Sequence, residues 1–326
     1  MKTVHLFILM LAASFVACSN DDDNSIQQPA EERLPLTIEV AENPMVNPDE
    51  AADAPATRAA IITTSTLDKF NINYVYGANY TNGDDPITAK KDTEGKWTSE
   101  GSWPTASETI DWYASSDGTF NEPSNPYINF TVEENASTQK DLLVAKTPAK
   151  YADNSGKVTF TFDHVCTALR FLVKKATNLD DYTLSITEMK LCNVKNNGLY
   201  YFNSHSWESL TVKQVKGENP SYTLYSGSAK TLGTTDYEVL DASDAPYLFM
   251  IPQPLTPWDG TTAIASATEQ TYIQITCTIM KDGNNVHSGT AYIPFGATLT
   301  AGYQHDVKIN IGKNSLYSGP NTKIIN

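Results

Sequence analysis

The sequence predicts an all-β protein arranged as two β-sandwiches in series. It contains 17 Tyr, 17 Gly and 17 Pro residues, a mixture typical of strands joined by many turns. β-Branched residues recur in short runs, and no segment shows a sustained helical period or a long repeat. A chain of 326 residues is long enough for two ordinary domains. We therefore expect an N-terminal domain at residues 34–152 and a C-terminal domain at residues 153–326.

The first residues predict export. An early lysine precedes an apolar run at residues 6–15, which is too short to span a membrane and has the anatomy of a secretory signal. Cys18 follows and is itself followed by SNDDDN, a pattern that resembles the lipobox and the surface-export tag of bacterial lipoproteins. An ordinary signal peptide with a chance cysteine is the alternative. We expect a lipoprotein signal peptide at residues 1–17, a lipid on Cys18, and a flexible acidic tether at residues 18–33.

Charge and cysteine content restrict the partners and the covalent structure. The formal net charge is -15 and the basic residues are scattered, which argues against a nucleic-acid partner. Once Cys18 is lipidated, three cysteines remain, without C-x-x-C spacing. Cys166 and Cys277 lie in strand-like runs, so we expect small buried hydrophobic residues. A disulfide between Cys166 and Cys192 is the alternative.

The N-terminal domain begins with a strand and a long loop. LPLTIEV has apolar residues at every second position, which predicts a strand with one apolar face. AENPMVNPDEAADAPAT follows, and its three prolines and many acids predict an exposed loop. A single arginine, Arg58, closes this loop just before a β-branched run. The apolar face of the strand consists of Leu34, Leu36, Ile38 and Val40.

Strand-like runs continue through both halves. KYADNSGK, at residues 150–157, interrupts the pattern and marks the expected domain boundary. In VTFTFDHVCTALRFLVKK the apolar phase flips at DHVCTA, which predicts a bulge or a helical turn. Asp282 and Gly283 are expected in the turn of a hairpin. Other predicted strands are FNINYVYGANY, NPYINFTV, KDLLVAK, YTLSITEMKLCNV, GLYYF, APYLFMIP and GYQHDVKINIGKN.

No arrangement of residues points to catalysis, a metal or a cofactor. The histidines after the signal lie far apart, and no hydrolase, nucleotide-binding, zinc-protease or calcium-loop motif occurs. We expect His164 to be a half-buried residue that orders a turn. Exposed tryptophans can stack on sugar rings, which keeps a glycan-binding role open, although burial between sheets is commoner. The tryptophans are Trp97, Trp103, Trp112, Trp207 and Trp258.

Five segments resemble, in this order, the fimbrillin-like family of surface lipoproteins, which are subunits of pili assembled by a protease-dependent route. The resemblance covers about residues 57–311. Three motifs in these segments are moderately specific for the family one by one and specific together: the aromatic segment with WP and DWYA, the F-x-F-x-H run and the IPQ triplet. The C-terminus lacks a trailing strand and Trp found in some members, which leaves a stalk or a tip position open. The segments are GKWTSEGSWPTASETIDWYASS, QKDLLVAKT, VTFTFDHVCTALRFLV, LFMIPQPLTP and PFGATLTAGYQHDVKINI.

The resemblance implies two transthyretin-like β-sandwich domains, export as a lipoprotein, and cleavage by an arginine-specific protease near the N-terminus. Arg58 is the matching position, so the cut would fall between Arg58 and Ala59. The residues themselves indicate the same arrangement, because an alternating strand, an acidic loop and one basic residue make a detachable segment with a cut site. We expect residues 34–58 to be this removable strand and loop.

Removing the strand would have a large energetic effect. Removal of residues 34–40 would uncover the groove that holds their four apolar side chains. Each of these side chains contributes about 1.5–3 kcal/mol when it is buried. Their sum is comparable with the net stability of a domain, about 5–15 kcal/mol. A strand of a neighbouring subunit can refill such a groove by β-augmentation. Ile324 and Ile325 make the tail a candidate donor, although it is short and its alternation is poor.

We therefore expect a stalk or tip subunit of a cell-surface fimbria at the outer membrane, serving adhesion and without catalytic residues, metal or cofactor. Its expected partners are other pilin subunits through β-strand complementation, the arginine-specific protease, the outer membrane through the lipid anchor, and a host or bacterial surface ligand. The alternative is a surface-anchored glycan-binding lipoprotein that does not polymerise.

Overall fold

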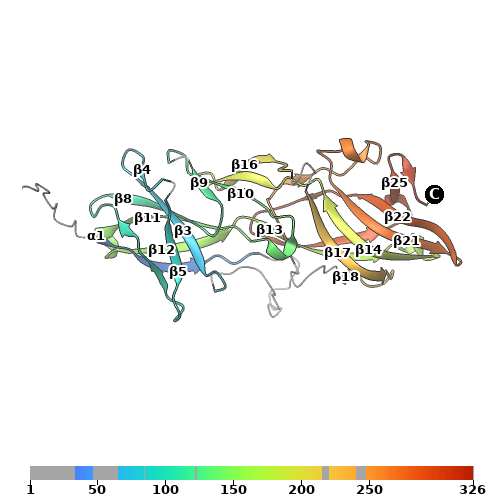
Figure 1. Cartoon of the computed structure of the whole chain (residues 1–326), viewed down its shortest axis with the longest axis horizontal. Coiled ribbons are helices and arrows are strands. Elements are labelled where there is room, and N and C mark those ends of the chain that lie inside the picture. The colour runs from blue at the N-terminus through green and yellow to red at the C-terminus, as the bar shows by residue number, and fades with distance from the viewer. Residues whose placement is uncertain are drawn as a thin grey trace, which may run out of the picture. The chain divides into compact units, whose positions relative to one another are not determined.

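β-Strands and turns account for nearly all of the described chain (Figure 1). The computed structural model describes residues 34–46, 65–83, 85–121, 123–214, 220–239 and 247–325. Among these residues one short α-helix is present, α1 at Tyr151–Asn154, within the segment that was expected to break the strand pattern. The all-β prediction is confirmed. Short 3-10 turns occur at Ala136–Thr138, Thr177–Leu179, Ile264–Ser266 and Lys313–Ser315.

The first large sheet has eight strands. The strand at Lys157–His164 alternates between buried apolar and more exposed polar residues, so one of its faces packs on a core. Val158, Phe160 and Phe162 are buried there, whereas Thr159 and Thr161 are exposed. The order in this sheet is β2 (Thr37–Glu42), β12 (Lys157–His164), β11 (Leu143–Lys150), β8 (Thr109–Ser115), β3 (Lys69–Tyr76), β5 (Ile87–Lys91) and β6 (Trp97–Ser99), with β4 (Tyr80–Thr81) paired to β3. Figure 1 labels several of these strands, among them β3, β5, β8, β11 and β12.

The core against this sheet, here called the first core, is strongly aromatic. Phe70 lies edge-on to Phe160 and Phe162, with ring centroids 5.7 and 5.1 Å apart. Trp103 lies edge-on to Trp112 at 5.0 Å. Such pairs add about 0.5–1.5 kcal/mol beyond the burial of their area. Trp103 belongs to a two-stranded pair beside the sheet, formed by β1 (Leu34–Pro35) and β7 (Ser102–Trp103).

A second set of strands surrounds a larger core, here called the second core, which includes Leu184, Ile186 and Ile275. A six-stranded sheet runs in the order β17 (Ser221–Thr231), β14 (Tyr182–Cys192), β21 (Tyr272–Lys281), β22 (Asn284–Pro294), β25 (Tyr317–Gly319) and β26 (Thr322–Lys323). Another sheet joins β13 (Thr167–Lys175) to β18 (Glu238–Val239), β19 (Leu248–Met250) and β24 (Gln304–Ile311), and β20 (Pro254–Leu255) pairs with β23 (Ala297–Thr298).

A small sheet combines strands from both sides of the boundary expected after residue 152. Its order is β16 (Ser206–Thr211), β15 (Asn197–Tyr201), β10 (Tyr127–Thr131) and β9 (Thr119–Asn121). β12 also follows that boundary, yet it pairs with β11 in the first sheet. Contacts group Leu34–Asn326 as one compact unit. The division into two transthyretin-like domains stays a prediction.

The chain passes from the first core to the second between β12 and β13. Phe160 and Phe162 of β12 belong to the first core, whereas Leu169 and Phe171 of β13 belong to the second. Only two residues separate these strands, and they form neither a bulge within one ladder nor a helical turn. The prediction of a bulge or a helical turn at DHVCTA was therefore wrong. The phase flips because the chain changes sheets at this point.

Two further segments test the predicted strands and loops. The hairpin of β21 and β22 is confirmed, and Asp282 and Gly283 have φ angles of 49° and 79° in its turn. The prediction of an exposed loop directly after Val40 was wrong at its start. β2 continues to Glu42, and Met45 is only 5% exposed because its side chain enters the second core.

Candidate functional site in the N-terminal strand

Residues 34–46, here called the N-terminal segment, complete the first sheet. β2 pairs in parallel with β12, with Ile38 opposite Val158. β1 pairs antiparallel with β7, with Leu34 opposite Trp103. β2 also lies against β6, the strand at the other end of the sheet order. The segment therefore closes the seam between β12 on one side and β6 and β7 on the other.

The four apolar residues predicted for this strand line the first core to different depths. Leu36 and Ile38 are 8% and 6% exposed. Leu34 and Val40 are partly buried and pack against the same core, whereas Glu39 between them is exposed. Burial of Leu36 and Ile38 contributes about 3–6 kcal/mol in total. The segment is thus inserted into the core and does not lie free in solvent.

The turn before β12 is shaped by the close approach of the segment. The carbonyl oxygen of Gly156 accepts hydrogen bonds from the Thr37 amide and from the Trp103 indole, each 2.9 Å long. Gly156 has a φ of +80°, and a Cβ there would lie 2.8 Å from the carbonyl oxygen of Pro35. Only glycine combines this conformation with so close an approach. The residue therefore anchors the start of the segment.

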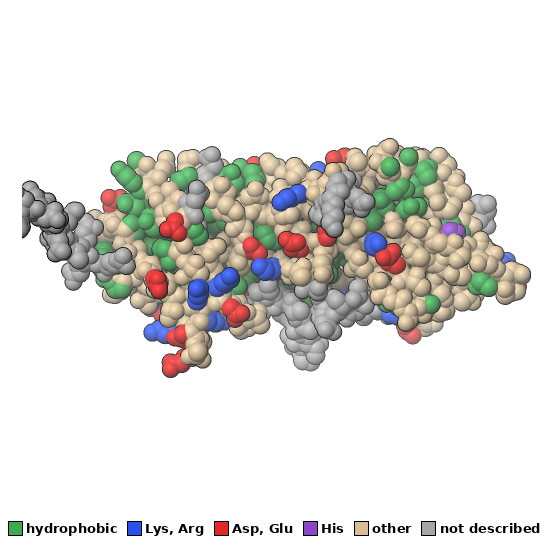
Figure 2. Space-filling view, in the orientation of Figure 1, with side chains coloured by type: hydrophobic (Ala, Val, Ile, Leu, Met, Phe, Trp, Pro, Cys, Tyr) green, Lys and Arg blue, Asp and Glu red, His purple; other side chains and the backbone are tan. Residues whose placement is uncertain are grey.

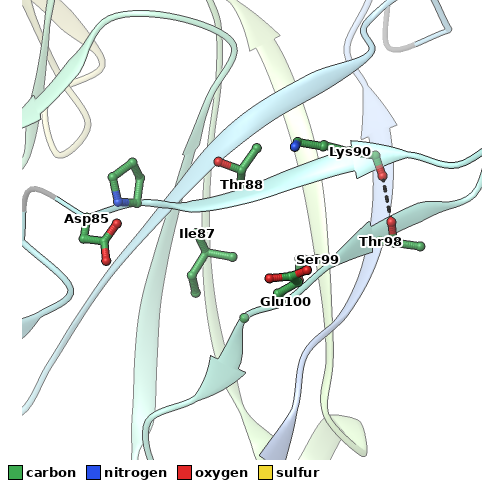
Figure 3. Close-up of a pocket in the computed structure, with 9 residues that line it drawn as sticks. Asp85, Ile87, Thr88, Lys90, Thr98, Ser99 and Glu100 are labelled. Carbon is green, nitrogen blue, oxygen red and sulfur yellow. Dashed lines mark hydrogen bonds between the residues drawn. The ribbon is translucent and has the colours of Figure 1, made fainter.

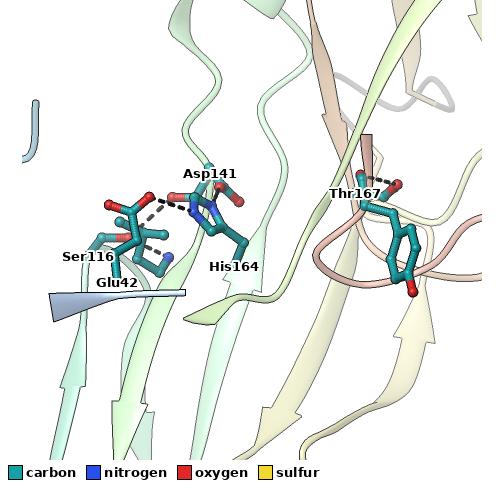
Figure 4. Close-up of polar contacts among 7 residues, drawn as sticks. Glu42, Ser116, Asp141, His164 and Thr167 are labelled. Carbon is teal, nitrogen blue, oxygen red and sulfur yellow. Dashed lines mark hydrogen bonds and ion pairs between the residues drawn. The ribbon is translucent and has the colours of Figure 1, made fainter. Parts of the chain in front are cut away.

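The inward-facing row of β2 ends in a carboxylate (Figure 4). Glu42 follows Val40 on that face, and its side chain is only 14% exposed. His164 Nε2 lies 3.2 Å from Glu42 Oε1, and His164 Nδ1 contacts the carboxylate of the fully buried Asp141. The Ser116 hydroxyl donates to the Asp141 carbonyl at 3.2 Å, which fixes the backbone of that residue. We call Glu42, Asp141 and His164 the carboxylate–histidine cluster.

Burial and charge oppose each other in this cluster. Burial alone would lower the pKa of His164, but hydrogen bonds and charge from Asp141 and Glu42 outweigh it and raise that pKa above its usual value. Burial raises the pKa of Asp141, and the hydrogen bond from His164 acts against this rise. His164 is itself only 5% exposed. The prediction of a half-buried histidine that orders a turn therefore missed its buried position between two carboxylates.

The end of the segment contacts the second core. The Asn43 amide donates to the Phe162 carbonyl at 2.9 Å, and its side chain donates to Asp163 at 2.6 Å. The Val46 amide donates to Gly302, at 2.8 Å. Met45 is buried in the second core. The segment thus contacts both cores before the chain leaves the described residues.

Three predicted site residues, Cys18, Arg58 and Ala59, lie outside the described residues. The other cysteines are buried and form no disulfide in the described part of the chain. Burial raises the pKa of the Cys192 and Cys277 thiols to about 12, which keeps them protonated and unreactive. This placement agrees with the expectation of small buried hydrophobic residues and not with a bridge between Cys166 and Cys192.

The tryptophans offer little surface for a sugar. Trp103, Trp112 and Trp258 are 3%, 0% and 2% exposed. Trp97 is partly buried against the first core, and Trp207 is partly buried and donates to the Val165 carbonyl at 2.7 Å. The glycan-binding alternative therefore loses the exposed tryptophans on which it depended.

The described surface also carries a polar hollow apart from the N-terminal segment. A hollow of about 580 Å³ lies over β5 and β6, and its polar lining includes Asp85, Lys90 and Glu100 (Figure 3). Figure 2 shows acidic and basic side chains interspersed on the visible face. Within the described ranges, no group of three His, Cys, Asp or Glu residues is arranged to hold a metal. The same ranges contain no helix long and apolar enough to cross a membrane.

The sequence pattern identified the apolar half of this site but not its polar half. Glu42 continues the two-residue alternation of β2, yet it was assigned to the loop because acids and prolines follow it. Asp141 and His164 lie far from Glu42 in the sequence, so no local pattern connects them. The usable signal was the row of inward positions, which extends one step further to Glu42.

The sequence and the fold of this chain are similar to those of known proteins. The sequence profile of a family described as fimbrillin-like matches residues 57–325. The solved structure of a fimbrial protein from Bacteroides vulgatus is similar, with a TM-score of 0.52 and 17% identity, and the match covers 85% of this chain and 95% of that chain. This similarity supports the all-β fold. No curated protein matched the chain.

Two candidate cell adhesion proteins also match. One, from Bacteroides eggerthii, has a TM-score of 0.49 and 14% identity, with 90% of each chain covered. The other, from Bacteroides ovatus, has a TM-score of 0.47 and 14% identity, with 87% of this chain and 94% of that chain covered.

Proposed function

Because this chain belongs to the fimbrillin-like family, we propose that it is a structural subunit, stalk or tip, of a cell-surface fimbria that serves adhesion. The family match covers residues 57–325, and it confirms the resemblance seen in the sequence. The family is one of fimbrial proteins, so the role is structural rather than catalytic. A host or bacterial surface molecule is the proposed ligand of the assembled fimbria.

One observation carries the proposal: an edge strand near the N-terminus fills the core of its own subunit. β2 buries Leu36 and Ile38 in the first core while only its pairing with β12 and the flanking contacts hold it. The family match begins at residue 57, at the end of the loop that follows this segment. Cleavage between Arg58 and Ala59 by an arginine-specific protease would leave the segment attached only by these non-covalent contacts.

Loss of the segment would favour exchange with a second subunit. The vacated seam would expose the edge of β12 and the aromatic residues of the first core. A strand of a neighbouring pilin subunit would restore both the backbone ladder and the buried apolar row. The severed monomer would thereby become a unit of a polymer.

Lipidation at Cys18 would hold the precursor at the outer membrane before this exchange. The tether at residues 18–33 would separate the anchor from the folded part. An acyl anchor acts through about 0.8 kcal/mol per buried methylene, so several chains hold a protein firmly. Cleavage after Arg58 would also detach the mature subunit from this anchor, and its final location would be the surface fimbrium.

The test uses an arginine-specific protease on the purified native precursor. The chain has three arginines, Arg33, Arg58 and Arg170. Arg170 lies within β13 and is paired with Asp306 at 2.7 Å, so the fold should protect it. We expect cleavage after Arg58, followed by higher oligomers in size exclusion, with the cut assigned by mass spectrometry. Mass spectrometry of the mature N-terminus on cells would report the lipid and the cut together.

Two arginine variants test whether oligomerisation depends on cleavage after Arg58. Arg58→Ala should remain monomeric after protease treatment, whereas the matched control Arg33→Ala should oligomerise like the unchanged chain. If cleavage after Arg58 leaves a monomer, or if Arg58→Ala oligomerises as readily, the proposed maturation is wrong. A Cys18→Ala variant should lose labelling by a fatty-acid probe, and retained labelling would refute the anchor.

A further inference from the structure

The carboxylate–histidine cluster divides between the N-terminal segment and the body of the subunit (Figure 4). Glu42 lies on β2, whereas Asp141 lies just before β11 and His164 ends β12. The Asp141 carbonyl accepts a hydrogen bond from the Ser116 hydroxyl, and the Asp141 carboxylate is hydrogen-bonded to His164, all within the body. If the segment leaves, the histidine and its aspartate therefore stay behind.

The vacated seam would then be apolar along most of its length and polar at one end. Leu36, Ile38 and Val40 occupy the apolar part, and Glu42 faces His164 at the end. A strand that buried only apolar side chains would leave His164 Nε2 facing a group that cannot accept its hydrogen bond. An unsatisfied buried polar group is costly, and more so where the neighbouring group is charged.

We propose that Asp141 and His164 form a recognition site for a carboxylate on the strand that replaces the N-terminal segment. The partner is thus a strand of another subunit with apolar residues at three alternate positions and Glu or Asp at the next alternate position. It runs parallel to β12, as β2 does. This inference rests on the proposed function, because it concerns the strand that enters the seam after exchange.

The site supplies information that the apolar row lacks. A slip of one residue turns the apolar side chains outward, so the core already rejects it. A slip of two residues keeps the same face inward and moves every side chain by about 6.6 Å along the strand. Such a slip would carry the carboxylate away from His164, whose contact with Glu42 is 3.2 Å long. The cluster therefore selects among registers that burial alone cannot distinguish.

The experiment starts from the full chain, which is cleaved after Arg58 and separated from its N-terminal segment. Peptide binding to the remaining protein is then measured. The probe is a fluorescent peptide with the sequence of residues 34–46, and binding is followed by anisotropy. A Glu42→Gln peptide should bind at least about tenfold more weakly, as expected for one charge-assisted hydrogen bond. The matched control is a Glu39→Gln peptide, altered on the exposed face, which should bind within about twofold of the unchanged peptide.

The outcomes separate this inference from the function on which it rests. On a folded chain carrying His164→Asn, the unchanged and Glu42→Gln peptides should bind equally. If the unchanged and Glu42→Gln peptides bind the unaltered cleaved chain with equal affinity, carboxylate recognition is overturned while strand exchange stands. If no peptide enters the cleaved chain, exchange and recognition both fail.

Discussion

The N-terminal segment and the C-terminal tail, here residues 322–325, both lie at sheet edges, but they differ in what they cover. β2 pairs in parallel with the distant β12 and closes a seam over the first core. β26 pairs with the adjacent β25, and its residues Thr322 and Lys323 are exposed. The tail buries mainly Ile325, at 4% exposure. We infer that loss of the N-terminal segment exposes the first core to solvent, whereas loss of the tail removes only a short edge strand of the six-stranded sheet.

The largest expected effect tests this contrast directly. The double variant Leu36→Ala/Ile38→Ala removes two buried side chains beside aromatic rings and should lower the free energy of unfolding by about 4–8 kcal/mol. The control Ile325→Ala should lower it by about 2–4 kcal/mol. Urea denaturation measures both values. A double variant that costs no more than Ile325→Ala would remove the distinction between the two segments.

The polar end of the seam should show a pH dependence. Because Asp141 and Glu42 raise the pKa of His164, the folded state binds its proton more tightly than the unfolded state. The resulting stability is fully present below about pH 6.5 and is lost as the pH rises through the raised pKa. Glu42→Gln should cost about 1.5–3 kcal/mol at pH 6 and lower the pKa of His164.

An NMR titration of the His164 ring, together with urea denaturation at pH 6 and pH 8.5, checks this expectation. An unchanged histidine pKa in Glu42→Gln would show that the contact with Glu42 does not influence protonation. A wild-type stability that rises over this interval would contradict the sign.

Two glycines sharpen the comparison at the level of the backbone. Gly156 has a φ of +80°, and an added Cβ would lie 2.8 Å from the Pro35 carbonyl oxygen, so Gly156→Ala should cost about 1–2 kcal/mol and loosen the N-terminal segment. Gly319 in β25 has open space around it and no positive φ, so Gly319→Ala should be nearly neutral. Hydrogen exchange of the β2 amides, with urea midpoints, would report both. Equal effects at the two glycines would contradict the close approach at Pro35.

The smallest effect is expected on the exposed face of β2. Lys157 Nζ lies 3.0 Å from Glu39, and this hydrogen bond lowers the pKa of the carboxyl group. Its contribution is present above about pH 4.5 and is lost as the pH falls. The pair is screened by water and salt, so Glu39→Gln should leave the urea midpoint almost unchanged. A large shift would mean that the outer face, and not the buried row, holds the strand.

Local patterns in the sequence predicted the strands whose alternation is regular. The row from Leu34 to Val40 and the turn at Asp282 and Gly283 depend on neighbouring residues, so they could be identified before the fold was known. The phase flip after Phe162 was visible too, although its meaning required knowledge of two separate cores. Such a flip indicates a change of burial face, and a change of sheet produces it as readily as a bulge.

The contacts that join distant segments could not be predicted. Parallel pairing of β2 with β12 leaves no turn signal, because the connection between the strands spans most of the first sheet. The meeting of Glu42 with Asp141 and His164 has the same origin. Met45 was assigned to a loop by its proline-rich surroundings, and only the position of the second core accounts for its burial.

The parallel pairing of β2 also sets an order of folding. Glu42 and His164 are 122 positions apart, so β2 cannot reach its place until β12 has emerged and formed. Closing so long a loop is slow compared with forming the hairpins between them. Until β2 arrives, the aromatic residues of the first core are uncovered on one side. During that interval a chaperone or another copy of the chain has access to the edge of β12, the edge at which we propose that strand exchange takes place.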